Sequence, residues 1–168
     1  MKLLLLFALL TSTSFSDQKI QEARQLFFRF DEDQHASAIL LLSLDKAGFN
    51  DSPVLLAYKG VALAASATAE SNPISKLNRF LEGKNLVEAA INQGPENPEL
   101  RLIRLSIQLT APGFLEYNKQ ISIDKNHIIN NLINNPDRFP NSMFREKVLI
   151  FLQTKAQLTA EEQRLLQN

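Results

Sequence analysis

The sequence predicts an all-α protein, and three observations support that prediction. Apolar residues recur at intervals of three and four along most of the chain, which is the period of an amphipathic helix. Every proline, alone or in a Pro-Gly pair, falls between two such segments, where it begins or breaks a helix. No segment has a persuasive strand pattern. We expect about 7–8 helices in a single domain, residues 17–168.

The first 16 residues have the pattern of a secretory signal peptide. Lys2 gives a positive start, Leu3–Leu10 is a short apolar run, and Ser14 and Ser16 occupy the −3 and −1 positions of a cleavage site. Such a run is too short to span a hydrocarbon core about 30 Å thick, which needs about 20 residues. We therefore expect cleavage before Asp17, a periplasmic or secreted protein, and no stable membrane anchor.

Two helices are predicted at the start of the mature chain. Residues 17–30 place their apolar side chains on one face and their charges elsewhere. Asp31–Asp33 then supplies an N-cap and first-turn acids for a second helix over residues 32–46. Gly48 ends that helix.

Two proline-started helices follow. Asp51–Pro53 combines a capping side chain with Pro in the first turn of a helix over residues 53–68, which is rich in alanine and carries one charge. Small residues on several of its faces predict close neighbours on several sides, so we expect this helix to be central. Asn72–Pro73 begins the next helix, which keeps its period to Ile91 across Gly83. Gly83 marks either a kink or a close helix crossing.

A pronounced turn at Gly94–Pro98 precedes a helix over residues 98–110. Apolar residues in this segment also alternate, as they would in a strand. Arg101, Arg104 and Gln108 nevertheless fall on one polar stripe of a helix, with apolar residues on both sides. The segment is therefore predicted to be helical.

Three further helices complete the predicted fold. Ala111–Gly113 breaks the chain before a helix over residues 122–132, and a second helix covers residues 142–155. Thr159 and Glu162 have the spacing of a capping box, which opens a short final helix.

The turn at residues 94–98 carries a resemblance to a known family. Ala89 and Ala90 stand at packing positions of one helix, and Pro95, Asn97 and Pro98 form the turn before the next. This arrangement resembles the junction between two tetratricopeptide (TPR) repeats, and the likeness covers residues 32–110. It implies antiparallel helical hairpins stacked as a short superhelix or bundle.

Three short phrases carry a second resemblance, over the whole mature chain. They lie at residues 72–77, 102–108 and 114–117. In these phrases the chain is similar to a group of small exported TPR-like proteins of Bacteroidetes. That likeness implies an envelope location and no established activity.

Composition excludes several functions. The 18 basic residues are balanced by 18 acidic ones, and loss of Lys2 with the signal peptide leaves a net charge of −1. Without a basic stripe the chain is not expected to bind nucleic acid. With no cysteine and two histidines it can form neither a thiolate metal site nor a disulfide. No cofactor is expected.

The remaining polar motifs are interpreted as structural. Asp124 and His127 share a helix face and form at most half of a metal site, so surface polarity is the favoured interpretation. Glu96 and Glu99 suit the first turn of a helix, where the macrodipole favours acids. Tyr58 and Tyr117 are expected at the edge of the core, with hydroxyls that form hydrogen bonds within the protein and do not contact a ligand.

One group of side chains is a candidate partner-binding site. Arg101, Arg104 and Gln108, joined by Lys76 and Lys84 of the preceding helix, could hold the carboxylate or backbone of an extended peptide.

A second interpretation of the two arginines is structural. They pair with Glu88 or Glu99 and cover apolar surface with their stems.

The function we expect is a non-enzymatic interaction module of the bacterial envelope that binds a partner protein or peptide through a helical-repeat groove. Two alternatives are a small-ligand-binding bundle and a hydrolase or lyase whose carboxylates sequence spacing does not identify.

Overall fold

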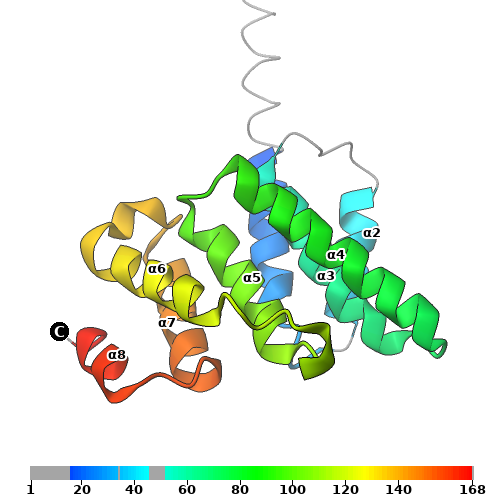
Figure 1. The fold of residues 1–168 in the computed structure, drawn as a ribbon. Helices are drawn as coiled ribbons and strands as arrows, with labels where there is room; N and C mark the ends of the chain where they lie inside the picture. Colours follow the sequence, from blue (N-terminus) through cyan, green and yellow to red (C-terminus); the bar gives the residue numbers. More distant parts are fainter. Residues whose placement is uncertain (1–15, 34, 46–51, 168) are drawn as a thin grey trace, which may run out of the picture.

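The structure, a computed structural model, describes residues 16–33, 35–45 and 52–167 as a packed bundle of eight α-helices with no strand (Figure 1). The all-α prediction is therefore confirmed for this part of the chain. The first helix covers residues 16–27, and the others are α2 (Ala36–Asp45), α3 (Pro53–Ser66), α4 (Pro73–Gln93), α5 (Pro98–Thr110), α6 (Ile121–Asn134), α7 (Ser142–Lys155) and α8 (Ala160–Leu165). Short 3₁₀ turns are η1 (Ala67–Ala69), η2 (Gly113–Leu115) and η3 (Pro136–Arg138).

Some sequence predictions fall outside the described residues. They concern residues 1–15 of the predicted signal peptide, Gly48 as the end of a helix and Asp51 as a capping residue. Ser16, the predicted −1 residue, begins the first helix. None of the described helices is both long and apolar enough to cross a membrane.

The predicted helix starts are confirmed where a cap precedes a proline. Oδ1 of Asn72 accepts the N–H of Ile74 at 2.8 Å, and Oδ1 of Asn97 accepts that of Glu99 at 2.9 Å. Each amide thereby satisfies a backbone donor that has no partner inside its helix. The capping box of Thr159 is also present in full at the start of α8.

The start of α2 corrects a prediction. The sequence favours a helix from residue 32 capped by Asp31–Asp33, but α2 begins at Ala36 and has no acid in its first turn. Asp33 instead accepts the N–H of His35 at 2.9 Å and pairs with Arg29 at 2.6 Å. Because its carboxylate closes a turn two residues long and also binds Arg29 in the turn after helix 16–27, the chain turns here before α2 begins.

α3 is the central helix, as predicted, and packs against α2, α4 and α5. Its approach to α4 depends on two glycines. A Cβ on Gly60 would lie 2.6 Å from the carbonyl oxygen of Gly83 and 2.7 Å from Cγ2 of Val87. α4 runs without interruption through Gly83, so this residue provides a close crossing.

α5 is buried over most of its length. It packs against α3, α4 and α6, and four of the largest fully buried side chains belong to it: Leu100, Leu102, Ile103 and Leu105. Three polar residues of this helix, Glu99, Arg104 and Gln108, are buried as well.

Helix 16–27 covers one face of the later helices. The ring of Phe27 lies 5.7 Å from that of Tyr58 on α3, and the guanidinium of Arg24 lies 5.4 Å from the ring centroid of Phe144 on α7. Lys19 donates to Oγ of Ser43 on α2 at 3.0 Å. In Figure 1 this helix lies between α2 to α4 on the right and α6 to α8 on the left. The face that α3 and α7 turn toward it is not available to a partner.

Candidate functional site

Two clusters of buried charges lie on α5. The first, the Glu99 cluster, joins Glu99 to Arg24 and Tyr58. Glu99 is 2% exposed, and its two oxygens accept from Nε and Nη2 of Arg24 at 2.8 and 2.7 Å. The hydroxyl of Tyr58 donates to Oε1 at 2.7 Å. This bidentate pair links helix 16–27, α3 and α5.

The Glu99 cluster corrects two predictions. The helix dipole alone was expected to explain Glu99, yet the carboxylate is buried against a cation from another helix. Tyr58 lies in the core and not at its edge. Burial, and next the charge of Glu99, raise the pKa of Tyr58 well above its ordinary value of 10.0.

The second, the Asp124 cluster, contains Asp124, Arg101, Arg104, Glu88 and Tyr117. Asp124 is 0% exposed, and Arg104 donates to it from Nε at 2.7 Å and from Nη2 at 2.6 Å. Arg101 adds a longer bond of 3.3 Å from Nη1. The interpretation of Asp124 as surface polarity is therefore wrong. Its partner Arg104 lies on α5, and the sequence around Asp124 does not indicate that contact.

Glu88 extends the Asp124 cluster toward solvent. One of its oxygens accepts from Nη1 of Arg104 at 3.0 Å, and the other accepts the hydroxyl of Tyr117 at 2.5 Å. Burial, followed by the hydrogen bond to Glu88, raises the pKa of the Tyr117 phenol above its ordinary 10.0. The pairing of Arg104 with Glu88 that the sequence allowed is confirmed; neither arginine pairs with Glu99 in the described part of the chain.

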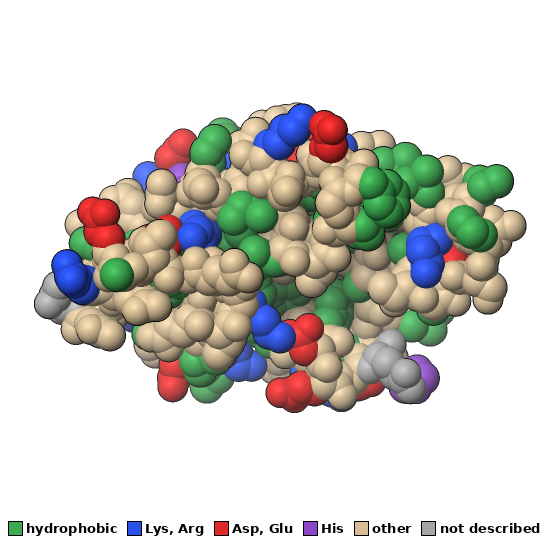
Figure 2. All heavy atoms as spheres, turned by 60° about the horizontal axis from the view of Figure 1, so that its bottom comes forward, with side chains coloured by type: hydrophobic (Ala, Val, Ile, Leu, Met, Phe, Trp, Pro, Cys, Tyr) green, Lys and Arg blue, Asp and Glu red, His purple; other side chains and the backbone are tan. Residues whose placement is uncertain are grey.

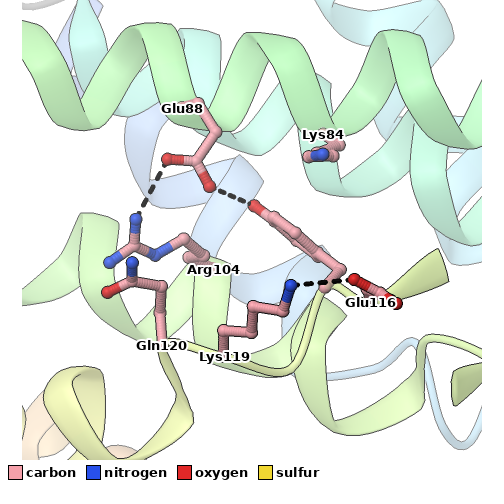
Figure 3. A pocket seen from close by; sticks show the side chains of 7 residues that line it. Lys84, Glu88, Arg104, Glu116, Lys119 and Gln120 are labelled. Atoms are coloured by element: carbon pink, nitrogen blue, oxygen red, sulfur yellow. Dashed lines mark hydrogen bonds and ion pairs between the residues drawn. The ribbon is translucent and has the colours of Figure 1, made fainter.

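The Asp124 cluster opens onto a surface cavity of about 250 Å³, which we call the hollow (Figure 3). α4, α5 and the turn before α6 line it with a set of mostly charged or polar side chains: Lys84, Glu88, Arg104, Glu116, Tyr117, Lys119 and Gln120. Figure 3 shows the amide of Gln120 beside the guanidinium of Arg104, with Lys119 turned toward Glu116 on the opposite side.

The predicted partner-binding residues are divided by the structure. Arg104 and Lys84 meet at the hollow. Arg101 turns toward the backbone oxygen of Pro95, to which Nη2 donates at 3.1 Å. Gln108 is buried, and its side-chain amide has no hydrogen-bond partner among the described residues. Lys76 is exposed on the first turn of α4, outside the hollow.

Five lining residues were not predicted as site residues, and one of them, Glu88, was considered only as a partner of the arginines. Glu116, Tyr117, Lys119 and Gln120 belong to the irregular segment between η2 and α6, which has no helical period. The one signal in this segment was the polar run itself, since four polar or aromatic residues following a Pro-Gly break mark an exposed turn.

An apolar surface adjoins the hollow. Ile74, Leu77 and Leu81 form the α4 stripe, spaced at three and four on one helix face, and they are 71%, 40% and 38% exposed. Lys84 and Glu88 continue the same spacing, so the stripe leads to the hollow. Figure 2 shows hydrophobic side chains gathered on the right of the molecule, where α4 begins. The sequence had assigned this apolar set to a helix without showing that it stays uncovered.

The side chains of Asp124 and His127 are both engaged by other groups of the chain. The described residues contain no group of three or more His, Asp or Glu side chains arranged to hold an ion. Asp124 is engaged by two arginines, and Nε2 of His127 lies 3.3 Å from the backbone oxygen of Glu96. The Asp124–His127 pair therefore does not form the half-site that its spacing allowed.

Comparison with known proteins gives no relative: no family model, no curated protein and no solved structure matches this chain. Function is therefore inferred from the contacts of this chain itself.

Proposed function

We propose that this protein is a non-enzymatic interaction module that binds a segment of a partner protein on the outer surface of α4. The observation that carries the proposal is the α4 stripe, whose exposed apolar side chains lead into the hollow. Exposed apolar side chains gathered on one face, next to charged ones, are typical of protein-binding surfaces.

The order of helix contacts supports a short TPR-like stack. α3 packs against α4 and α5, α4 packs against α5, and α5 packs against α6. Each hairpin thus contacts its sequence neighbour, as in stacked helical repeats.

The position of helix 16–27 favours the outer surface over the inner face of such a stack. Its contacts with Tyr58 on α3, Glu99 on α5 and Phe144 on α7 occupy the face on which a groove would lie. A partner that binds without displacing this helix has α4 and η2 open to it, including Phe114, which is 80% exposed.

The charges beside the stripe define the partner segment. Lys76 and Lys84 lie on α4, and Lys119 lies across the hollow. A partner segment that has apolar residues and at least one acid complements this surface. Its apolar residues match the α4 stripe, and its acid matches the lysines. The signal-peptide pattern of residues 1–16 supports a partner in the periplasm or outside the cell.

A peptide display selection on the purified protein tests the proposal. We expect selected peptides to combine apolar and acidic residues, and to lose at least tenfold in affinity for an Ile74→Ser/Leu77→Ser variant. The matched control is Ile123→Ser/Ile150→Ser, since these side chains are similarly exposed on α6 and α7. Circular dichroism shows whether both variants keep their helices.

Two results would overturn the proposal. One is a selection that enriches no peptide for the wild-type protein over the stripe variant. The other is a set of peptides that lose affinity equally for the stripe variant and for the control variant.

A further inference from the structure

Resting on the proposed function, we infer that the hollow binds one carboxylate of the partner segment while the α4 stripe holds its apolar residues. The carboxylates that line the hollow have hydrogen-bond partners, whereas some of its N–H donors have none in the described part of the chain. Both oxygens of Glu88 already accept, one from Arg104 and one from Tyr117. The carboxylate of Glu116 is held by Lys119 at 2.8 Å. Both carboxylates of the hollow therefore already accept from cations or a hydroxyl of the lining.

Donors remain. A guanidinium has five N–H groups, and Arg104 uses three of them, two on Asp124 and one on Glu88. One N–H on each terminal nitrogen has no partner in the described part of the chain. The amide of Gln120, beside this guanidinium in Figure 3, likewise has none there.

Charge adds to this surplus of donors. Lys84 lies 5.0 Å from the ring centroid of Tyr117 and pairs with no carboxylate of the described residues. The lining has three cations and two carboxylates, which gives it a net charge of +1. A single carboxylate neutralises that charge and accepts the remaining hydrogen bonds, whereas a cation would add to the positive charge of the lining.

The rigidity of Arg104 favours this role. Its guanidinium is fixed by Asp124, which is fully buried, so its remaining N–H groups are oriented before a ligand arrives. An oriented donor loses less conformational entropy on binding than a mobile lysine does. Lys119 is free to turn from Glu116 to the ligand, because both side chains of that pair are exposed.

Acetate titration tests the hollow without any partner. The readout is the shift of the Arg104 Nε–H and Gln120 amide signals by nuclear magnetic resonance, with sodium chloride at equal ionic strength as the reference. We expect saturable shifts at these groups with acetate that fall at least fivefold in Lys84→Gln/Lys119→Gln. Lys76→Gln is the matched control, because Lys76 is exposed on the same helix but outside the hollow. Equal responses to acetate and chloride would overturn the inference.

Peptides from the display selection separate this inference from the proposed function. One arm amidates the peptide C-terminus and another replaces each acid by its amide, which distinguishes a terminal from a side-chain carboxylate. We expect the peptide of one arm to bind the wild-type protein at least fivefold more weakly than the unmodified peptide does. For Lys84→Gln/Lys119→Gln the modified and unmodified peptides should bind equally. If stripe substitutions abolish binding while both arms and this variant leave it unchanged, the inference fails and the proposed function stands. If acetate binds in the hollow but no peptide needs the stripe, the proposed function fails instead.

Discussion

The Glu99 and Asp124 clusters are built from the same kinds of group, yet they differ in their access to solvent. Each holds a buried carboxylate, an arginine that binds it through two nitrogens, and a tyrosine hydroxyl bonded to a carboxylate. Helix 16–27 covers the first cluster, whereas the second ends at the hollow. Enclosure makes the first cluster a structural link, and the opening leaves donors of the second cluster available to a ligand.

The largest expected effect comes from breaking the enclosed cluster. Glu99→Gln leaves the Arg24 guanidinium without its carboxylate in a site with little access to water, and we expect a loss of about 3–5 kcal/mol in the free energy of unfolding. Urea denaturation measures it. Glu96→Gln is the control, since Glu96 is exposed and its loss should cost no more than about 0.5 kcal/mol. A cost below about 1 kcal/mol for Glu99→Gln would contradict the structural role.

The same substitution in the open cluster should cost less. Asp124→Asn removes the main partner of Arg104, but Glu88 stays bound to that arginine, which borders the hollow. We expect a loss of about 1.5–3 kcal/mol, measured in the same urea series. Asp137→Asn, at an exposed position of η3, is the control. A cost equal to that of Glu99→Gln would remove the distinction between the clusters.

Tyrosine ionisation compares the clusters directly, because the chain has two tyrosines and no tryptophan. The pKa of both phenols is raised in the fold, so their stabilising contribution is present below pH 10.0, the ordinary value, and is lost as the pH rises beyond it. We expect no tyrosinate absorbance until alkaline unfolding, when both phenols ionise together.

Glu88→Gln should separate the two phenols. The change removes a negative charge and a hydrogen bond that, after burial, raise the pKa of Tyr117. Tyr117 should then ionise at a lower pH than in the wild type, whereas Tyr58 should still ionise only when the protein unfolds. Glu82→Gln, exposed on the same helix, should leave the titration unchanged. A single unaltered step in Glu88→Gln would show that the carboxylate does not act on Tyr117.

The smallest effect is expected at the rim of the hollow. Lys119 and Glu116 are 72% and 73% exposed, and pairs so close to water contribute little to stability. Lys119→Gln should change the free energy of unfolding by no more than about 0.5 kcal/mol, by urea denaturation. A loss above about 1 kcal/mol would mean that the rim supports the fold and is not free to serve a ligand.

Much of the fold could be predicted because its signals are local. The caps at Asn72, Asn97 and Thr159 and the prolines beside the first two act on backbone groups within three residues, so the sequence places these helix starts correctly. Gly83 indicated a kink or a close crossing, and the contact with α3 decides for the crossing, since a Cβ there would collide with the carbonyl oxygen of Gly60. Asp33 is the exception, because two local structures compete for its carboxylate and the turn prevails.

The site depended on contacts that no local pattern contains. Arg24 and Glu99 are 75 residues apart, and Arg104 and Asp124 are 20 apart, so their pairing is decided when helices pack. The helical period places both arginines of α5 on one polar stripe. It does not show whether that stripe faces solvent or is buried.

The amino-acid sequence alone determined the all-α class, most helix boundaries and the absence of cysteine chemistry, because propensity, capping and composition do not depend on distant residues. Tertiary structure decided which charges are enclosed, that Arg104 borders the hollow, and that the α4 stripe is left uncovered. The physical reason is that burial and dielectric environment belong to the packed helices together, and a side chain acquires them only from its neighbours in space.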